Sequence, residues 1–401
     1  MEPMRFHLRT VVAGLLLSRP AAAQEPEERP ELPRGADPAS AQAYYDEGVT
    51  VLRRDPRRAE VLFRWASRLD PEWAEPYEGR RAALMIAQQR NLPEYFRVSR
   101  RVSAFRLADS LRAQASMRNP LQLRPFEGEV VQAAVRATAR ALDPTETLDP
   151  TELEFMIEQS YRGNLEMRAM LAYSNNELPY ALELYGEAVE RGDSISRGFL
   201  LSDRAHVLAA AGRYEEARAE YDSALAALRK LDEEIIYVYL SKALQLYSMG
   251  LMAELLENPK QARDDYNRAL EEDLSFHPAH VALARLSLAE GDTTSALFSY
   301  RMAADLAPDD PTIRMKVAGL LVATGDPAGA QGEVEAAIAA NPYYAPPRLV
   351  LGALAERGGR TADAIAEYER YLELAPRSER NRAPIQNRVA ALKAAAGENP
   401  R

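Results

Sequence analysis

The sequence contains no cysteine anywhere in the chain. That absence excludes disulfide bonds, thiol nucleophiles, cysteine-ligated metals and a lipid-attachment cysteine. Histidine is scarce as well, and beyond the N-terminal stretch 1–23 it occurs only at His206, His277 and His280. His277 and His280 are close enough in sequence to place two imidazoles on one helical face. Pro278 follows His277 and places it in the turn between repeats, and no third ligand is spaced nearby, so we interpret both as structural.

Sequence signatures of catalysis are also missing. The chain has no glycine-rich phosphate-binding loop, no Gly-x-Ser-x-Gly elbow and no His-Glu-x-x-His zinc helix. Carboxylates occur on every predicted helix, so no acid–base pair stands out. No interior stretch is apolar for the length of a membrane span. We therefore predict a protein that is not an enzyme, with no cofactor and no metal.

The N-terminal stretch 1–23 has the features of a secretory signal peptide. Arg5 and Arg9 precede an apolar run over 11–17, and Ala21–Ala23 forms a small-residue cleavage site. We predict export to the bacterial periplasm or the cell exterior; an uncleaved N-terminal anchor or a wrong start codon is the alternative. Residues 24–40 carry four prolines among glutamates and are predicted to be a stiff, disordered spacer.

Alanine recurs at one constant interval in the C-terminal half of the chain, at Ala262, Ala296, Ala330 and Ala364. The same kinds of residue surround each alanine. A large side chain stands four positions later (Tyr266, Tyr300, Val334 and Tyr368), and a small residue stands twelve before (Gly250, Ala284, Ala318 and Gly352). The position five before is usually glycine (Glu257, Gly291, Gly325 and Gly359), and the position twelve after is usually proline (Leu274, Pro308, Pro342 and Pro376). A fixed period of this length is typical of a stacked helical array.

Each unit is predicted to be a pair of antiparallel helices. In the unit around Ala296, Gly291 ends the first helix, because glycine readily adopts the left-handed conformation that a helix C-terminus needs. Asp292 can then cap the second helix, and Pro308 stops it. Ala284 and Ala296 are placed where the two helices cross, since only a small residue allows close approach.

This pattern resembles the tetratricopeptide repeat family, whose consensus pairs an alanine with an aromatic residue four later and a proline at the exit. Further units are centred on Ala217 and Ala181, and a second helix around Ala59 and Phe63 follows a first helix that contains Gly48. The resemblance implies an all-α fold, a right-handed helical-repeat solenoid of antiparallel helix pairs. We divide the chain into the signal peptide 1–23, the spacer 24–40, an Arg-rich helical region 41–149 with one recognisable and one diverged repeat, an array of about six units over 150–376, and a capping helix and tail over 377–401.

Two stretches depart from the period. The interval between Ala217 and Ala262 is longer than the others, and the surplus is predicted to lengthen a helix over 235–256. Between 72 and 150, helices are predicted over 80–89, 93–117 and 129–142 without clean units, either as a diverged repeat or as a separate helical module. After the last unit, the apolar stripe of Ile385, Val389 and Leu392 predicts the closing helix.

Charge is unevenly distributed along the chain. Residues 51–140 hold 18 Arg and 10 acidic residues, whereas residues 141–401 hold 27 basic and 42 acidic residues. The Arg-rich helices of 51–112 can be interpreted as a docking surface for an acidic partner or anionic lipid. The alternative is a solvated face neutralised by neighbouring carboxylates. Nucleic acid is not expected to bind an exported acidic protein.

The family's register places the inner face of such an array on the first helix of each pair. The candidates for a partner-binding groove there are Met170, Tyr173, Phe199, Ser202, His206, Tyr247, Leu251, Val281, Arg285, Met315, Leu349 and Ala353. The set is apolar with few charges, which favours a groove for an apolar peptide segment or amphipathic helix of another protein. Packing against adjoining units is the alternative. Some family members grip a C-terminal carboxylate with a clamp of Lys, Arg and Asn, for which only Arg285 could serve here.

The leading hypothesis for function is a non-enzymatic protein–protein interaction scaffold of the cell envelope. One alternative is a self-assembling structural protein that forms a homo-oligomer. Another is an accessory module of an envelope enzyme or secretion complex. A diverged hydrolase within 72–150 is a further alternative, and that stretch lacks a nucleophile–base arrangement.

Overall fold

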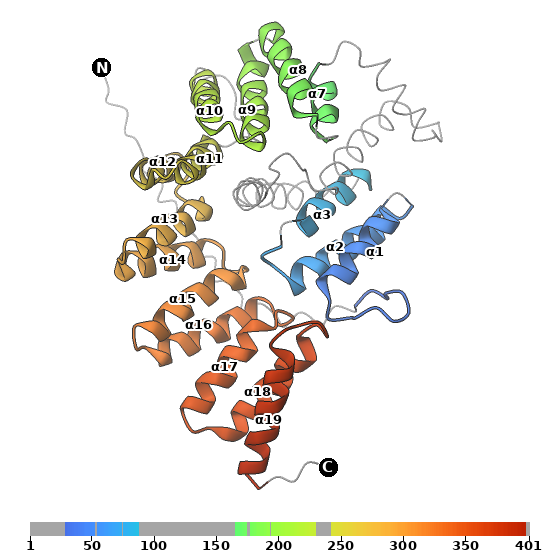
Figure 1. Ribbon diagram of the computed structural model, residues 1–401, viewed down its shortest axis with the longest axis vertical. Helices are drawn as coiled ribbons and strands as arrows, with labels where there is room; N and C mark the ends of the chain where they lie inside the picture. Colours follow the sequence, from blue (N-terminus) through green and yellow to red (C-terminus); the bar gives the residue numbers. More distant parts are fainter. Residues whose placement is uncertain are drawn as a thin grey trace, which may run out of the picture. The chain divides into compact units, whose positions relative to one another are not determined.

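The computed structural model describes residues 29–397, except for 53, 74, 88–164, 175–176, 193 and 230–241. Every regular element in these ranges is an α-helix, and no strand occurs among them (Figure 1). Contacts divide the chain into a short unit, Met1–Glu31, and one compact unit, Leu32–Arg401. The predicted signal peptide 1–23 lies outside the described residues.

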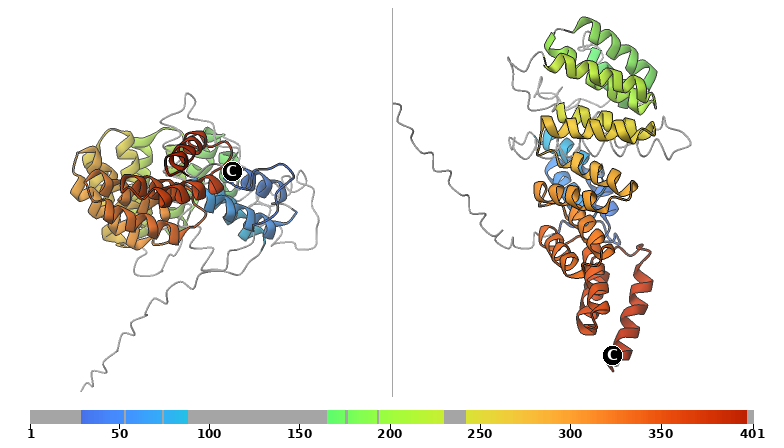
Figure 2. Two further views of the ribbon diagram at one scale, coloured as in Figure 1. Left: turned by 90° about the horizontal axis from the view of Figure 1, so that it is seen from below. Right: turned by 90° about the vertical axis from the view of Figure 1, so that its left-hand side faces the viewer.

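The helices form consecutive pairs, as the repeat predicts. The pairs are α1 (Ala41–Val51) with α2 (Pro56–Leu69), α7 (Leu165–Ser174) with α8 (Leu178–Arg191), α9 (Ser194–Ala210) with α10 (Tyr214–Arg229), α11 (Lys242–Leu255) with α12 (Pro259–Glu272), α13 (His277–Ala289) with α14 (Thr293–Leu306), α15 (Pro311–Ala323) with α16 (Pro327–Ala340), and α17 (Pro346–Arg357) with α18 (Thr361–Leu374). From α8 onward each second helix also packs against the first helix of the next pair, and α19 (Arg382–Ala395) closes the series against α18 (Figure 2). The predicted all-α helical-repeat solenoid and its closing helix are confirmed.

The turns inside the pairs use the predicted chemistry. Gly291 and Gly325 have φ of 82° and 85°, in the left-handed region that glycine enters without strain. Asp292 then caps α14, because its Oδ1 accepts a hydrogen bond from the backbone N–H of Ser295 at 3.0 Å. The prolines predicted to stop the second helices follow closely after the ends of α14, α16 and α18: Pro308, Pro342 and Pro376.

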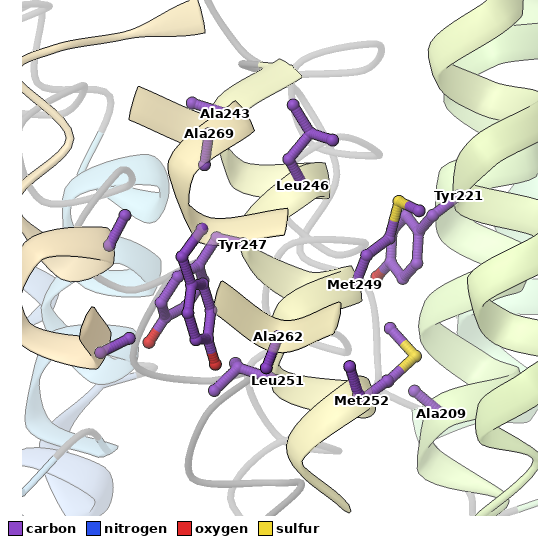
Figure 3. Close-up of a cluster of buried hydrophobic side chains, with 14 of the residues drawn as sticks. Ala209, Tyr221, Ala243, Leu246, Tyr247, Met249, Leu251, Met252, Ala262 and Ala269 are labelled. Carbon is purple, nitrogen blue, oxygen red and sulfur yellow. The ribbon is translucent and has the colours of Figure 1, made fainter. Parts of the chain in front are cut away.

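Along the array from α7 to α17, side chains from neighbouring pairs share core clusters, so these pairs support one another. Around α11, Met249 faces Tyr221 of α10, and Met252 lies beside Ala209 of α9 (Figure 3). Tyr247 points to the other side of the same helix. The four period-setting alanines are completely buried where the helices cross: Ala262, Ala296, Ala330 and Ala364.

A third helix packs against the two helices of the N-terminal repeat, where the sequence predicted a helix without a clean repeat unit. Helix α3 spans Glu75–Ile86 and packs against α2, so the helix predicted over 80–89 begins earlier. Gly79 lies inside α3, where an added β-carbon would stand 2.6 Å from the ring of Phe63. A glycine in mid-helix weakens the sequence signal, but here the aromatic ring of α2 requires it. Gly48 of α1 faces the same ring at 2.8 Å.

Several predictions fall partly or wholly on residues that are not described. The helices predicted over 93–117 and 129–142 lie outside the described residues. So do residues 235–241 of the helix predicted over 235–256; its described part, α11, begins at Lys242 and has the same length as α12. Within the predicted spacer 24–40, Leu32 packs against the core of the N-terminal repeat and Ala39 is buried. Ser40 caps α1 by accepting a hydrogen bond from the N–H of Ala43 at 3.3 Å.

Candidate protein-binding surface

Four of the predicted groove residues are buried between repeats. Tyr173, Ser202, Tyr247 and Leu251 are only 4–6% exposed. The ring centroid of Tyr247 lies 5.5 Å from the rings of both Tyr266 and Phe276, in the next helices along the chain. These residues contribute to packing between units, which is the stated alternative to the groove at these positions.

On α9, Phe199 and His206 are half-buried. Nε2 of His206 lies within hydrogen-bond distance, 3.0 Å, of the hydroxyl of Tyr173, and the two rings are T-shaped with centroids 5.6 Å apart. This contact joins α7 to α9, the first helices of two neighbouring pairs. Met170 lies on α7, and its side chain is not among those described.

Arg285 is engaged in an ion pair. Its guanidinium contacts the carboxylate of Glu254 on α11, and the same carboxylate accepts a hydrogen bond from the hydroxyl of Tyr266. Burial raises the pKa of Tyr266 far above its ordinary value, and the negative charge of Glu254 raises it further. Because Arg285 already neutralises Glu254, a clamp for a partner's carboxylate would have to compete with this pair.

A further part of the first-helix face lies on α13, α15 and α17. Val281, Met315 and Leu349 are half-buried and pack partly against the core clusters, and Ala353 is exposed. Val281, Met315 and Leu349 occupy corresponding turns of successive first helices. This subset of the predicted residues therefore remains the candidate for a partner-binding surface.

Two accessible residues of this face were missed by sequence reasoning. Leu288 on α13 is 38% exposed. Gly319 on α15 has open space beside it, since no atom lies within 4 Å of the place where a β-carbon would stand. Gly319 stands one full repeat period after Arg285 and one before Ala353, so the repeat spacing itself was the signal that could have identified it.

Ion pairs beside this face are formed within the helix pairs. Arg314 of α15 contacts Glu333 of α16 at 3.2 Å, and Arg348 of α17 contacts Glu367 of α18 at 3.1 Å. Both pairs join equivalent positions of their repeats, and their side chains are about one-fifth to one-quarter exposed. These two arginine charges are thus compensated by carboxylates of the same helix pairs.

The Arg-rich region is described only in its first part. There, Arg58 pairs with Glu47 at 3.2 Å and Arg80 with Glu60 at 2.7 Å. These contacts agree with the interpretation of a face neutralised by neighbouring carboxylates. Residues 88–112 of this region lie outside the described residues.

The remaining candidates for chemistry lie on α13. His277 begins the helix, and burial lowers the pKa of His280. Within the described ranges, no group of three or more histidines and carboxylates is arranged to hold a metal ion. Among the helices described there, none is long and apolar enough to cross a membrane.

Helix pairs that repeat at a regular period define a helical-repeat array. A family model described as tetratricopeptide repeat matches residues 253–311 and 318–379. This part of the chain is therefore made of tetratricopeptide repeats, and the matched residues are those where the period is most regular.

Three solved structures illustrate what the chain is similar to. YrrB, described as a tetratricopeptide-repeat protein with an unusual peptide-binding site, is 19% identical with a TM-score of 0.38, over 52% of this chain and 99% of that one. The C-terminal part of a repeat protein from Cytophaga hutchinsonii is 13% identical with a TM-score of 0.41, over 52% and 78%. A tetratricopeptide repeat protein from Parabacteroides merdae is 17% identical with a TM-score of 0.35, over 73% and 99%. No curated protein sequence matches the chain.

Proposed function

We propose that the protein is a non-enzymatic scaffold that binds an apolar segment of another protein along α13, α15 and α17. Tetratricopeptide repeats serve protein–protein interaction, and stacked repeats present extended surfaces for it. The observation that carries the proposal is the accessible first-helix face, where Leu288, Met315 and Leu349 offer apolar atoms on successive repeats. An amphipathic helix or extended segment with apolar anchors matches such a surface.

The cell envelope is the proposed place of action. This part of the proposal rests on the predicted signal peptide 1–23, with its arginines, apolar run and small-residue cleavage site. Its separate test is fractionation of cells that express the full chain, with N-terminal sequencing of the recovered protein. A mature N-terminus near Gln24 in the envelope fraction supports export, whereas an intact chain in the cytoplasm contradicts it.

Site-specific photo-crosslinking tests the binding face. A photo-reactive amino acid at Gly319, where the space is open, should capture partners in cells. The same amino acid at Phe298 should not; Phe298 is 65% exposed but lies on α14, a second helix. Capture of another protein from 319 alone supports the proposal, whereas capture of a second copy of the chain favours the self-assembling alternative. Equal capture from both positions contradicts the proposed face.

Charge substitution is the complementary test. The pair Met315→Glu and Leu349→Glu places two carboxylates on the face and should reduce partner recovery about tenfold or more, because each charge must be desolvated on binding. Phe298→Glu makes the same change of chemistry on α14 and should leave recovery unchanged. Full recovery of the partner by a double variant that is still folded would contradict the assignment of this face.

A further inference from the structure

The N-terminal repeat contacts the C-terminal repeats through one group of side chains. Trp65 of α2 and Tyr343, in the turn between α16 and α17, have ring centroids 4.7 Å apart in a T-shaped arrangement. The guanidinium of Arg68 lies 5.3 Å from the Trp65 ring and 5.9 Å from the Tyr343 ring. The side-chain amide of Asn341 donates a hydrogen bond to the backbone carbonyl of Arg68 at 2.7 Å, although the two residues are far apart in sequence.

Two further polar contacts join the same two parts of the chain. Lys316 of α15 pairs with Glu72 at 2.7 Å, with side chains 38% and 57% exposed. In addition, the carboxylate of Asp37 accepts a hydrogen bond from the backbone N–H of Arg377 at 2.6 Å. Exposed ion pairs are weak and are screened by salt, so these contacts orient the two parts more than they hold them.

The two sides of this contact keep separate cores. The N-terminal cluster is built from its own helices, with Phe63 and Trp65 completely buried, and Tyr343 is its one described member from the C-terminal repeats. The helices on the other side pack into clusters of their own, around Val317 and Tyr371. Neighbouring repeats, in contrast, interdigitate alanine, leucine and tyrosine in shared clusters. The contact therefore differs in kind from the contacts within the array.

We propose that this contact is a reversible clasp. The N-terminal repeat docks through Trp65 and Arg68 onto Asn341 and Tyr343, and it is released as a rigid body while both sides stay folded. Interactions of these kinds, an aromatic pair, a cation–π contact and an amide hydrogen bond, are individually modest, and motions of this type occur where a small interface joins two separately packed bodies. This conformational device does not depend on the proposed protein-binding function.

Intrinsic fluorescence reports the state of the clasp directly. The chain has two tryptophans, Trp65 and Trp73, so in a Trp73→Phe background the emission comes from the clasp residue alone. Tyr343→Ala should shift this emission to longer wavelength and raise its acrylamide quenching several-fold, while far-UV circular dichroism stays unchanged. Tyr180→Ala is the matched control, because Tyr180 is 41% exposed on α8 and remote from the clasp in sequence.

A distance measurement on the full chain completes the test. Because the sequence has no cysteine, Arg57→Cys and Gly332→Cys introduce the only two spin-label sites, on α2 and α16. The parent should give one narrow distance distribution, and Tyr343→Ala or Asn341→Ala should give a broad, longer one with helicity retained. A narrow distribution and protected Trp65 in both variants would overturn the clasp. So would a loss of helicity that accompanies the change in distance, since the contact would then belong to a common core.

Discussion

Gly352 of α17 lies directly against the ring of Tyr368 of α18: a β-carbon at position 352 would stand 2.5 Å from Tyr368 Cδ1. This relation explains why the position twelve before each period-setting alanine is small. In the repeat at 277–306 the same two positions are held by Ala284 and Tyr300, both buried. Ala284 thus shows that a methyl group is tolerated at this position when the two helices of the pair pack around it.

Substitution of the two helical glycines should therefore have opposite effects. We expect Gly352→Ala to lower the free energy of unfolding by about 1–2 kcal/mol, because the ring of Tyr368 must be displaced from a packed position. Gly319→Ala should raise it by roughly 0.5–1 kcal/mol, since the site is open and alanine is the better helix former. Urea denaturation followed by circular dichroism measures both. Equal effects at the two positions would show that the Tyr368 contact is not tight.

Glu257 has a φ of 56°, in the left-handed region, at the position where Gly291, Gly325 and Gly359 stand in the following repeats. An L-residue with a side chain is strained there. We expect Glu257→Gly to raise the free energy of unfolding by about 1 kcal/mol, although glycine also increases the entropy of the unfolded chain. Thermal unfolding measures the change, and Gly291→Ala, which introduces the same strain, should lower stability by a similar amount. A lower melting temperature for Glu257→Gly would refute the strain.

The sequence predicts best what each repeat determines locally. The alanines, the glycine and aspartate of the turns and the exit prolines fix helix boundaries through backbone chemistry, and the structure follows them from α11 to α18. The helix predicted over 80–89 leaves out Gly79, which lies inside α3 because the close approach of Phe63 leaves no room for a larger residue. That reason becomes visible only when α2 and α3 are packed together.

The candidate surface was predictable only in part. The period assigns Tyr247 and Leu251 to the first-helix face as firmly as Met315 and Leu349, but it carries no information about local burial. Only the structure shows that the first two are 4% and 6% exposed. The contact of Trp65 with the α16–α17 turn could not be predicted from the sequence for another reason. It joins distant residues by tertiary packing, and no pattern in the sequence connects them.

The hydroxyl of Tyr266 should matter for stability at high pH. In the folded protein burial and Glu254 raise the pKa of this tyrosine and keep it neutral, whereas in the unfolded chain it ionises near pH 10.0. A group whose pKa is raised by folding stabilises the fold below its unfolded pKa and loses that contribution as pH rises further. The free energy of unfolding should therefore fall above about pH 10, and Tyr266→Phe should make this fall shallower.

At neutral pH the same Tyr266→Phe substitution should cost about 1.5–3 kcal/mol, the usual value of one lost hydrogen bond to a charged group. Tyr180→Phe on the exposed face of α8 serves as the control and should change neither property appreciably. Urea denaturation at neutral pH and just above the ordinary tyrosine pKa measures both effects. A pH dependence in Tyr266→Phe as steep as in the parent would show that other tyrosines account for the fall.

Asp265 of α12 forms the most buried ion pair of the described array. Its Oδ2 lies 2.7 Å from Nη1 of Arg218 on α10, with side chains 3% and 12% exposed, and Arg218 also donates to the backbone carbonyl of Met249 on α11. Arg218→Met should lower the free energy of unfolding by about 3 kcal/mol or more, because it leaves a buried carboxylate without its main partner. Arg268, which contacts the other carboxylate oxygen at 3.1 Å, limits the loss.

A double variant separates the cost of an orphaned charge from the value of the pair. Replacing both partners, Arg218→Met with Asp265→Leu, should recover most of the lost stability, since a buried ion pair and a well-packed apolar pair differ little in net free energy. Arg204→Met provides the comparison, because Arg204 and Glu220 form a more exposed ion pair with side chains 27% and 18% exposed. It should cost roughly 1 kcal/mol or less. If the double variant is as unstable as Arg218→Met, the arginine acts chiefly through its bond to the carbonyl of Met249, and the link between α10 and α11 is what stabilises this junction.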